Sequence, residues 1–501
     1  MEVLEQLLCE ARDEFAAGNL DQARLVCLAG LSEFPYTPQL LTVLGWIYAQ
    51  RGDRPSAEAA FRHALCGDAA SFDAHSGLAA VLAADGRHQE AESSFARAIS
   101  IFADDSDTLF GYGCALIALR RYEQAAEVLE QTLRLEPNRV GAIHNLAIAH
   151  AQLGRWQQAA EYCDQALAAD SQATQSQLLR GMSRIAMGSF AEGWDDYDAR
   201  CRLQDDYSRQ LGLPAWNGIA KVHSIVVVPE QGIGTQVMLA SCLADLLAVV
   251  PSVTVGCELR LIGPLQRSFP TVTFVADGLL PALVASGNYD AYVMAGSLPR
   301  VFRRTLTAFP ARTYLEAEPA RRRRWRERLT ELGSGLKVGV AWGGGAGKAD
   351  TVHRRTVPQD WWPLVTVPNV DWINLQFDVP RAEFAEWRQL AGGRFHDWSD
   401  LDRKHDLENF AALVSELDLV ISVVNSTVHV AGALGVPTWT LVPAGGEWRW
   451  LASGEKCVWH DSVRLFRQRQ LDDWSSVFRS LRSELASLSR TSSRRRRKHA
   501  A

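Results

Sequence analysis

Apolar positions in the first two-fifths of the chain repeat with a constant step. From Ala23 to Ala57 the step is 34 residues, and small side chains recur with it in two series. The series are Ala23, Ala57, Ala91, Ala125, Ala159 and Gly193, and Ala11, Gly45, Ala79, Gly113, Ala147 and Gly181. Very small residues at two fixed places in a repeated unit indicate pairs of helices that cross at closest approach. The pattern predicts a helical solenoid over residues 4–205.

Other positions of the unit agree with this prediction. Phe61 and Phe95 follow two of the alanines by four residues, and glycines recur where one helix has to end and the chain has to turn. These glycines are Gly18, Gly52, Gly86, Gly154 and Gly188. In period and key positions the segment resembles the tetratricopeptide repeat over about six units. The last unit is atypical, with Arg180 and Arg200 at normally apolar places. The resemblance implies a surface that binds a protein or peptide partner.

Short apolar, β-branched runs replace the repeat after residue 200. They form one series at 225–229, 253–257, 272–275 and 291–294, and a second at 337–342, 371–376, 419–423 and 438–442. Apolar strands that alternate with helices are typical of parallel sheets covered on both faces. We therefore predict an α + α/β chain: a solenoid, then two doubly wound lobes at 221–320 and 336–480 that face a cleft. A charged helix at 320–335 joins the lobes. Its four arginines, 321–324, are interpreted as a solvated or salt-bridged face rather than an anion site.

Composition limits the cellular location of the protein and the kinds of partner that it can bind. The net charge of −6 argues against non-specific binding of nucleic acid, which needs a basic surface. The longest apolar stretch, 237–250, is short and carries Asp245, so we expect no transmembrane segment. Nine cysteines show no zinc-like spacing, which predicts no metal site and a cytoplasmic protein. Residues 489–501, with five consecutive basic residues at 494–498, are predicted to be a disordered, solvated tail; binding to a membrane surface or nucleic acid is the weaker alternative.

The most specific stretch is 418–450. A buried strand ends before Asn425, Ser426 and Thr427, and a helix of small residues follows. Asn and Ser favour the start of a helix, where backbone N–H groups are free and the helix dipole is positive. Such a helix start binds anions and suits a diphosphate. The alternative is that Ser426 only caps the helix.

The surroundings of this stretch resemble the heptosyltransferase-like glycosyltransferases, in particular members with N-terminal tetratricopeptide repeats. The resemblance covers about residues 222–470 and implies the two-lobed GT-B fold. It rests on these motifs: Glu230 to Gly234, Gly339 to Gly344, Arg355 to Pro358, Gln376, Ser426 with His429 and residues 431–435, Trp448 to Trp450, and Arg464 to Gln468. It implies an inverting transfer from a nucleotide-sugar donor in the C-terminal lobe to an acceptor against the N-terminal lobe, with no metal or other cofactor.

Site residues follow from the resemblance. The donor and diphosphate set is Trp342, Gly344, Lys348, Arg355, Gln376, Asn425, Ser426, Thr427, His429 and Arg449; the acceptor loop is Gln231, Gly232, Gly234 and Thr235. Lys348, Arg354 and Arg355 would neutralise the leaving diphosphate. The glycine run at 343–347 is not a P-loop, because Trp342 stands at its first glycine position and Ala349 at its hydroxyl position.

The chain departs from the family at the position of the general base. Where the family places an Asp after Gly-x-Gly, this sequence has Thr235, and Val424 and Asn425 replace an Asp-Thr pair. A sugar acceptor hydroxyl needs a base within hydrogen-bond reach. Glu230 is the preferred substitute; His429, Glu447 and His353 are the others. Glu230 bonded to backbone N–H groups and a packed His429 are the competing interpretations. Two hypotheses result: a glycosyltransferase whose repeats recruit the acceptor, or a catalytically inactive scaffold.

Overall fold

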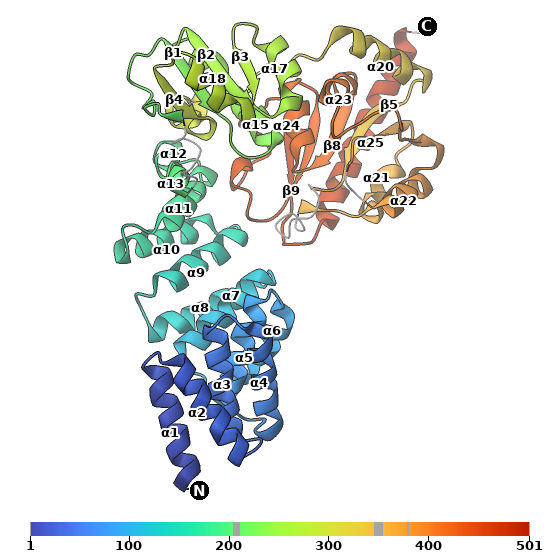
Figure 1. Ribbon diagram of the computed structural model, residues 1–501. Helices are drawn as coiled ribbons and strands as arrows, with labels where there is room; N and C mark the ends of the chain where they lie inside the picture. Colours follow the sequence, from blue (N-terminus) through green and yellow to red (C-terminus); the bar gives the residue numbers. More distant parts are fainter. Residues whose placement is uncertain (1, 204–210, 345–353, 378–379, 500–501) are drawn as a thin grey trace. The chain divides into compact units, whose positions relative to one another are not determined.

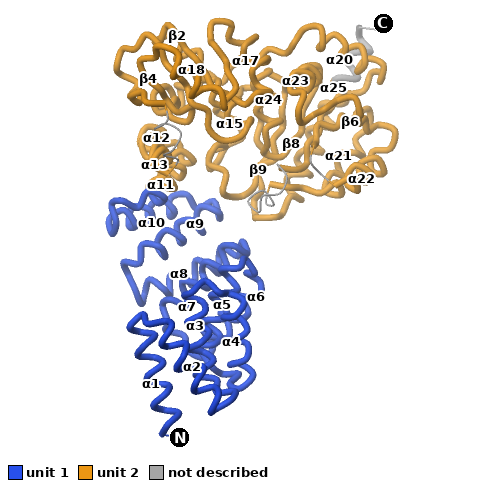
Figure 2. Tube along the Cα trace, viewed as in Figure 1, with its two compact units in different colours: residues 1–176 blue, residues 177–501 orange. Residues whose placement is uncertain are grey.

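The computed structural model describes residues 2–203, 211–344, 354–377 and 380–499, with side chains to Thr491. The chain forms two compact units, Met1–Ser176 and Gln177–Ala501, which are coloured separately in Figure 2. Unit 1 holds the first five helix pairs, and most of the last pair belongs to unit 2 (Figure 2). The fold class predicted from the sequence, a helical solenoid followed by an α/β region with parallel sheets, is confirmed.

The solenoid consists of paired antiparallel helices. They are α1 (Glu2–Ala16), α2 (Leu20–Glu33), α3 (Pro38–Gln50), α4 (Arg54–Gly67), α5 (Phe72–Ala84), α6 (His88–Ile101), α7 (Ser106–Ala118), α8 (Tyr122–Leu135), α9 (Val140–Gln152), α10 (Trp156–Ala169), α11 (Thr174–Ala186) and α12 (Phe190–Tyr197). The alanines of both predicted series are fully buried. A Cβ atom on Gly45 would lie 2.7 Å from the Phe61 ring, so the small residues do stand where helices cross.

The last pair crosses more tightly than the others. A Cβ atom on Gly181 would lie 2.6 Å from the backbone N of Tyr197 and 2.8 Å from the carbonyl O of Gly193. The arginines at apolar places are neutralised: Arg180 donates two hydrogen bonds of 2.8 Å to Asp196. The short helix α13 (Arg200–Leu203) follows and carries the buried Arg200.

Two parallel sheets build the rest of unit 2. The four-stranded sheet has the order β3-β2-β1-β4 and the six-stranded sheet β10-β9-β8-β5-β6-β7. The strands are β1 (Ser224–Val228), β2 (Ser252–Cys257), β3 (Thr273–Ala276), β4 (Ala291–Met294), β5 (Leu336–Ala341), β6 (Val370–Asn374), β7 (Phe395–His396), β8 (Leu419–Val423), β9 (Thr438–Val442) and β10 (Val463–Arg467). All eight predicted strands exist; β7 and β10, at the edges of the larger sheet, were not predicted.

Helices connect the strands of each sheet. They are α15 (Ile233–Ala240), α16 (Leu243–Leu247), α17 (Ile262–Ser268), α18 (Leu280–Ser286), α19 (Leu298–Phe302), α20 (Pro319–Glu331), α21 (Trp362–Val365), α22 (Arg381–Ala391), α23 (Leu407–Val414), α24 (Ser426–Ala433) and α25 (Ser475–His499). On α20, Arg321 pairs with Asp406 of the α23 cap, and Arg322 and Arg326 pair with Glu416. This confirms the salt-bridged interpretation of that helix.

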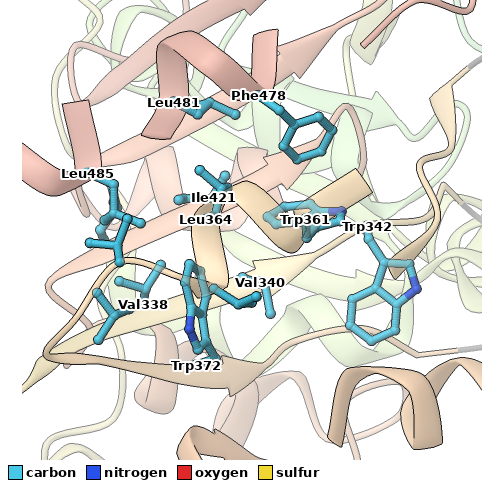
Figure 3. Close-up of a cluster of buried hydrophobic side chains, with 14 of the residues drawn as sticks. Val338, Val340, Trp342, Trp361, Leu364, Trp372, Ile421, Phe478, Leu481 and Leu485 are labelled. Carbon is cyan, nitrogen blue, oxygen red and sulfur yellow. The ribbon is translucent and has the colours of Figure 1, made fainter. Parts of the chain in front are cut away.

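The C-terminal helix α25 includes most of the stretch predicted as a tail from residue 489. α25 continues to His499, and no proline or glycine interrupts it. Leu481 and Leu485 are fully buried in the core of the larger sheet (Figure 3), and the Ser489 hydroxyl donates to the Pro368 carbonyl at 2.8 Å. None of the helices in the described part of the chain combines the length and the apolar character needed to cross a bilayer.

Gly181→Ala should loosen the last repeat, because the added methyl group meets backbone atoms that cannot rotate away. We expect a cost of about 2 kcal/mol and correspondingly faster amide hydrogen exchange in α11 and α12. Gly113→Ala is the matched control: its methyl group meets only the Leu129 side chain, and alanine favours the helix by up to about 1 kcal/mol. Equal effects of the two substitutions on local exchange would contradict the backbone contact.

Candidate functional site

A cleft of about 580 Å³ lies where the strands of both sheets have their carboxyl ends. Its walls come from the loops after β1, β5, β6, β8 and β9, which is where open α/β sheets bind ligands. The lining residues are Gln231 to Thr235, Arg260, Ala341, Gly343, Gly344, Arg354, Leu375 to Phe377, Lys404, Val424 to Thr427, His429, Glu447, Arg449 and Trp450.

Two helices begin in this cleft and touch each other there. Gly232 precedes α15, and Asn425 caps α24 by accepting the Thr427 N–H at 2.9 Å. The helices lie side by side (Figure 1), and a Cβ atom on Gly234 would be 3.0 Å from Ser426 Cα. Since the first N–H groups of a helix lack intrahelical partners and carry partial positive charge, both helix starts favour an anion in the cleft.

Asn425 and Gln376 fix the loop after β5. The Asn425 side chain also donates to the Gly343 carbonyl at 3.2 Å and accepts the Ser422 hydroxyl at 3.1 Å. The Gln376 side chain accepts the Gly343 N–H at 2.8 Å. Both polar groups of the Gly343 backbone are therefore engaged. These two residues shape the cleft by holding its backbone in place.

Cationic side chains dominate the charge of the cleft. Among the described lining residues they are Arg260, Arg354, Lys404 and Arg449, against the single carboxylate of Glu447. Arg354 forms an ion pair with Glu447. Arg449 donates to the Gln231 side-chain oxygen at 2.6 Å and packs over the Trp448 ring at 4.4 Å. The balance is positive, which favours an anionic ligand.

His429 is buried at the back of the cleft in a pair of imidazoles. Its ring stacks on Trp450 with centroids 5.1 Å apart, and its Nδ1 lies 3.3 Å from His460 Nε2. Burial, reinforced by His460 and Arg449, holds the pKa of His429 well below its usual range. Burial also lowers the pKa of His460 to about 3. Both rings are therefore neutral at neutral pH, and one of them donates the hydrogen bond.

Glu230 does not lie in the cleft, which corrects its predicted place in the lining loop. Its carboxylate accepts two hydrogen bonds of 2.8 Å from Arg200 and one of 2.6 Å from the Gly296 N–H. The side chain is 2% exposed and that of Arg200 4%. The competing interpretation, a carboxylate bonded to backbone N–H groups, describes the contact with Gly296. The ion pair with Arg200 of α13 was not predicted. Thr235 does line the cleft, and its hydroxyl donates to Gln231 at 3.3 Å.

Two residues of the predicted donor set lie elsewhere. Trp342 is fully buried in the core of the larger sheet (Figure 3), and its indole N–H donates to Glu383 at 2.7 Å. Arg355 pairs with the same Glu383. Both predictions are corrected: a carboxylate from α22 holds these side chains away from the cleft. Lys348 and His353 lie outside the described residues.

The other predicted residues do line the cleft: Gly344, Gln376, Asn425, Ser426, Thr427, His429 and Arg449, with Gln231, Gly232 and Gly234 of the acceptor loop. Sequence reasoning missed Arg260 and Lys404. Arg260 follows the end of β2, and its guanidinium donates to the Lys404 carbonyl. The position of Arg260 after a strand is the one signal that could have indicated it.

Comparison with known proteins identifies the repeats. Family models described as tetratricopeptide repeat match residues 38–63, 71–136 and 112–184. Protein FlbA of Caulobacter vibrioides is 30% identical over 315 residues, which are 60% of this chain and 52% of that protein. The chain thus spans about half the length of the curated relative that it matches.

Solved structures similar to this chain cover about a third to two-fifths of it. YrrB, a TPR protein with an unusual peptide-binding site, is 16% identical with a TM-score of 0.34, over 36% of this chain and 93% of YrrB. MamA is 20% identical with a TM-score of 0.31, over 34% of this chain and 93% of MamA. PilF of Pseudomonas aeruginosa is 19% identical with a TM-score of 0.35, over 40% and 90%. Residues 38–184 are tetratricopeptide repeats, which bind protein or peptide partners.

The neutral imidazole pair predicts a pH dependence of stability. Unfolded histidine binds a proton below about pH 6.5, whereas His460 in the folded protein stays neutral down to a pKa of about 3. The stabilisation is complete above about pH 6.5 and is lost as the pH falls toward 3, by up to about 1.4 kcal/mol per pH unit for one histidine. His460→Gln should flatten this slope in urea unfolding measured between about pH 7 and pH 4. His223→Gln, at an exposed position, is the control; equal slopes in both variants would rule out the pair as the cause.

Proposed function

We propose that this cleft binds the diphosphate of a nucleotide sugar and that the chain transfers the sugar to a protein or peptide acceptor recruited by its repeats. The observation that carries the proposal is the convergence of two helix starts and four cationic side chains on one cleft. A diphosphate leaving group develops negative charge as the sugar departs, and preorganised N–H groups and cations stabilise that charge.

The division of the cleft between the two lobes supports separate donor and acceptor sides. Asn425, Ser426 and Thr427 open α24 at the carboxyl edge of the larger sheet, and we assign the donor to this side. The acceptor side is the loop from Gln231 to Thr235, which opens α15. The volume of the cleft lies within the range of about 300–1,000 Å³ usual for small-molecule sites. Nine free cysteines favour a reducing compartment, so we place the reaction in the cytoplasm.

His429 is the best candidate for the general base. Among the described residues of the cleft wall, Glu447 is the one carboxylate, and Arg354 engages it. A neutral His429 accepts a proton at Nε2 if its own Nδ1–H donates to His460 Nε2, which lies 3.3 Å away. Its lowered pKa makes it a weak base, so proton abstraction at His429 implies slow turnover.

A second function has its own support: binding of the nucleotide without transfer. Thr235 stands where the resembling family has its Asp, and Glu230 is held by Arg200 outside the cleft. Both observations remove a carboxylate from the acceptor side. In this alternative the transferase-like part is a ligand-controlled scaffold for partners of the repeats.

Ser426→Asp should strongly weaken nucleotide binding, because a carboxylate in the first turn of α24 would occupy the positive helix start and repel a diphosphate. Calorimetry with UDP, ADP and GDP should find at least one nucleotide that binds the wild-type chain, with affinity reduced on the order of 100-fold in the variant. Ala320→Asp is the matched control, because it places the same charge in the first turn of α20, outside the cleft.

The two functions separate in a second measurement. Incubation with nucleotide sugars should release the nucleoside diphosphate if the chain is a transferase, and His429→Gln should stop the release. Binding without release would select the scaffold. If the wild-type chain binds none of the nucleotides or nucleotide sugars, the proposed function fails in both forms.

A further inference from the structure

The last repeat reaches the edge of the cleft. Helix α12 ends in Tyr197, whose ring lies 5.1 Å from that of Trp448, and Trp194 of the same helix contacts Trp448 and Trp459. The Trp194 indole N–H donates to the Arg303 carbonyl at 3.0 Å, and both side chains of α12 are buried. The repeat is therefore anchored to both lobes within unit 2.

Gln231 of the acceptor loop has an unfavourable backbone conformation. Its φ angle is 59°, in the left-handed region that is unfavourable for a non-glycine residue. Such a conformation persists where the surroundings determine it. Both ends of the Gln231 amide are held: its Nε2 donates to the Tyr197 hydroxyl at 3.0 Å, and its Oε1 accepts from Arg449 at 2.6 Å. One contact comes from the repeat and the other from the cleft.

The preceding residue is held from the same repeat segment. Glu230 receives both of its side-chain ion contacts from Arg200 on α13, and Arg200 is held in turn by Asp198 at 2.8 Å. Removing one member of a buried ion pair leaves an uncompensated charge, which is strongly destabilising. Two consecutive residues of the loop that opens α15 are thus fixed by two residues of the last repeat, Tyr197 and Arg200.

The geometry points to Tyr197 and Arg200 as positioning residues of the cleft: the last repeat holds residues 230–232 so that the start of α15 and Arg449 face the same ligand. This inference rests on the proposed function for the identity of that ligand. It makes the cleft sensitive to the repeats, because a partner that displaces α12 also releases Gln231 and Arg449.

The test uses the full chain and two independent measurements. Tyr197→Phe keeps the ring between Trp194 and Trp448 and deletes only the hydroxyl group. We expect faster amide hydrogen exchange in residues 232–236 without ligand, and an affinity for UDP, ADP or GDP, whichever binds, reduced about five-fold, as for the loss of one hydrogen bond. Tyr289→Phe is the matched control, because its hydroxyl contacts Thr254 outside the cleft.

Gln231→Gly separates positioning from a merely structural role. Glycine removes the bridge and also relieves the left-handed backbone, so affinity should fall while the free energy of unfolding does not. Adding Tyr197→Phe to Gln231→Gly should cost no further affinity, because Tyr197 acts through Gln231.

The outcomes distinguish the two proposals. Unchanged exchange at 232–236 in Tyr197→Phe overturns the positioning inference whether or not a nucleotide binds. Faster exchange with unchanged nucleotide affinity also overturns it, because the held loop would then not serve the cleft. If no nucleotide binds the wild-type chain, the proposed function fails, and the exchange measurement still decides the role of Tyr197.

Discussion

The starts of α15 and α24 lie in close contact, since a Cβ atom on Gly234 would be 3.0 Å from Ser426 Cα. Each start carries unsatisfied N–H groups, so the contact brings two positive dipole ends together. Arg449, which also lines the cleft, adds to the same charge, whereas the charge of Arg354 is compensated by Glu447. The arrangement is unfavourable by itself and becomes favourable around an anion. The two sheets bring the helix starts together because each sheet places a helix start after the carboxyl end of a central strand, β1 or β8.

The contact between the helix starts requires that the loop before α15 be rigid, and the last repeat supplies the rigidity. Arg200 and Glu230 are almost fully buried. Their removal from water has a desolvation cost that can exceed the attraction between the two charges. The geometry of this ion pair, however, fixes one position of Glu230 relative to Arg200. Apolar packing would allow these residues to shift. The aromatic side chains of Trp194, Trp448 and Trp459 surround the junction and provide the apolar burial that offsets the cost.

The sequence predicted the repeats and the central strands because both leave a periodic signal. The alanines and glycines recur at a fixed step, and β1, β5 and β8 are short, mainly apolar runs. The two edge strands escaped prediction for the opposite reason: β7 has two residues, and β10 alternates Arg464 and Arg467 with apolar positions. Within the site, Asn425, Ser426 and Gly234 were predictable from backbone requirements. Asn and Ser favour the start of a helix, and the close contact of the two helices at position 234 favours glycine.

Ion-pair partners far apart in the sequence were not predictable. No motif near Glu230 indicates that Arg200, thirty residues earlier, will be its partner. Likewise, no motif near Trp342 or Arg355 indicates Glu383. In each case a residue that we had assigned to the cleft lies outside it, because its side chain binds an opposite charge or a hydrogen-bond acceptor on another element. A family motif identifies such residues by type, and only the fold decides which way their side chains turn. Arg260 and Lys404 were missed for the same reason, since long cationic side chains reach the cleft from loops without a motif.

Thr235 stands where the resembling glycosyltransferases have an Asp, and this difference affects the charge of the cleft as well as the supply of a base. Position 235 lies in the first turn of α15, where a carboxylate would be stabilised by the helix dipole and would compete with a diphosphate for the same positive charge. Threonine leaves that charge available, so the cleft is better suited to hold an anion than to deprotonate an acceptor. Under the proposed transfer, the proton between His429 and His460 has a defined consequence: a bare His429 Nε2 would accept the acceptor's proton, whereas a protonated Nε2 would donate to the bound ligand.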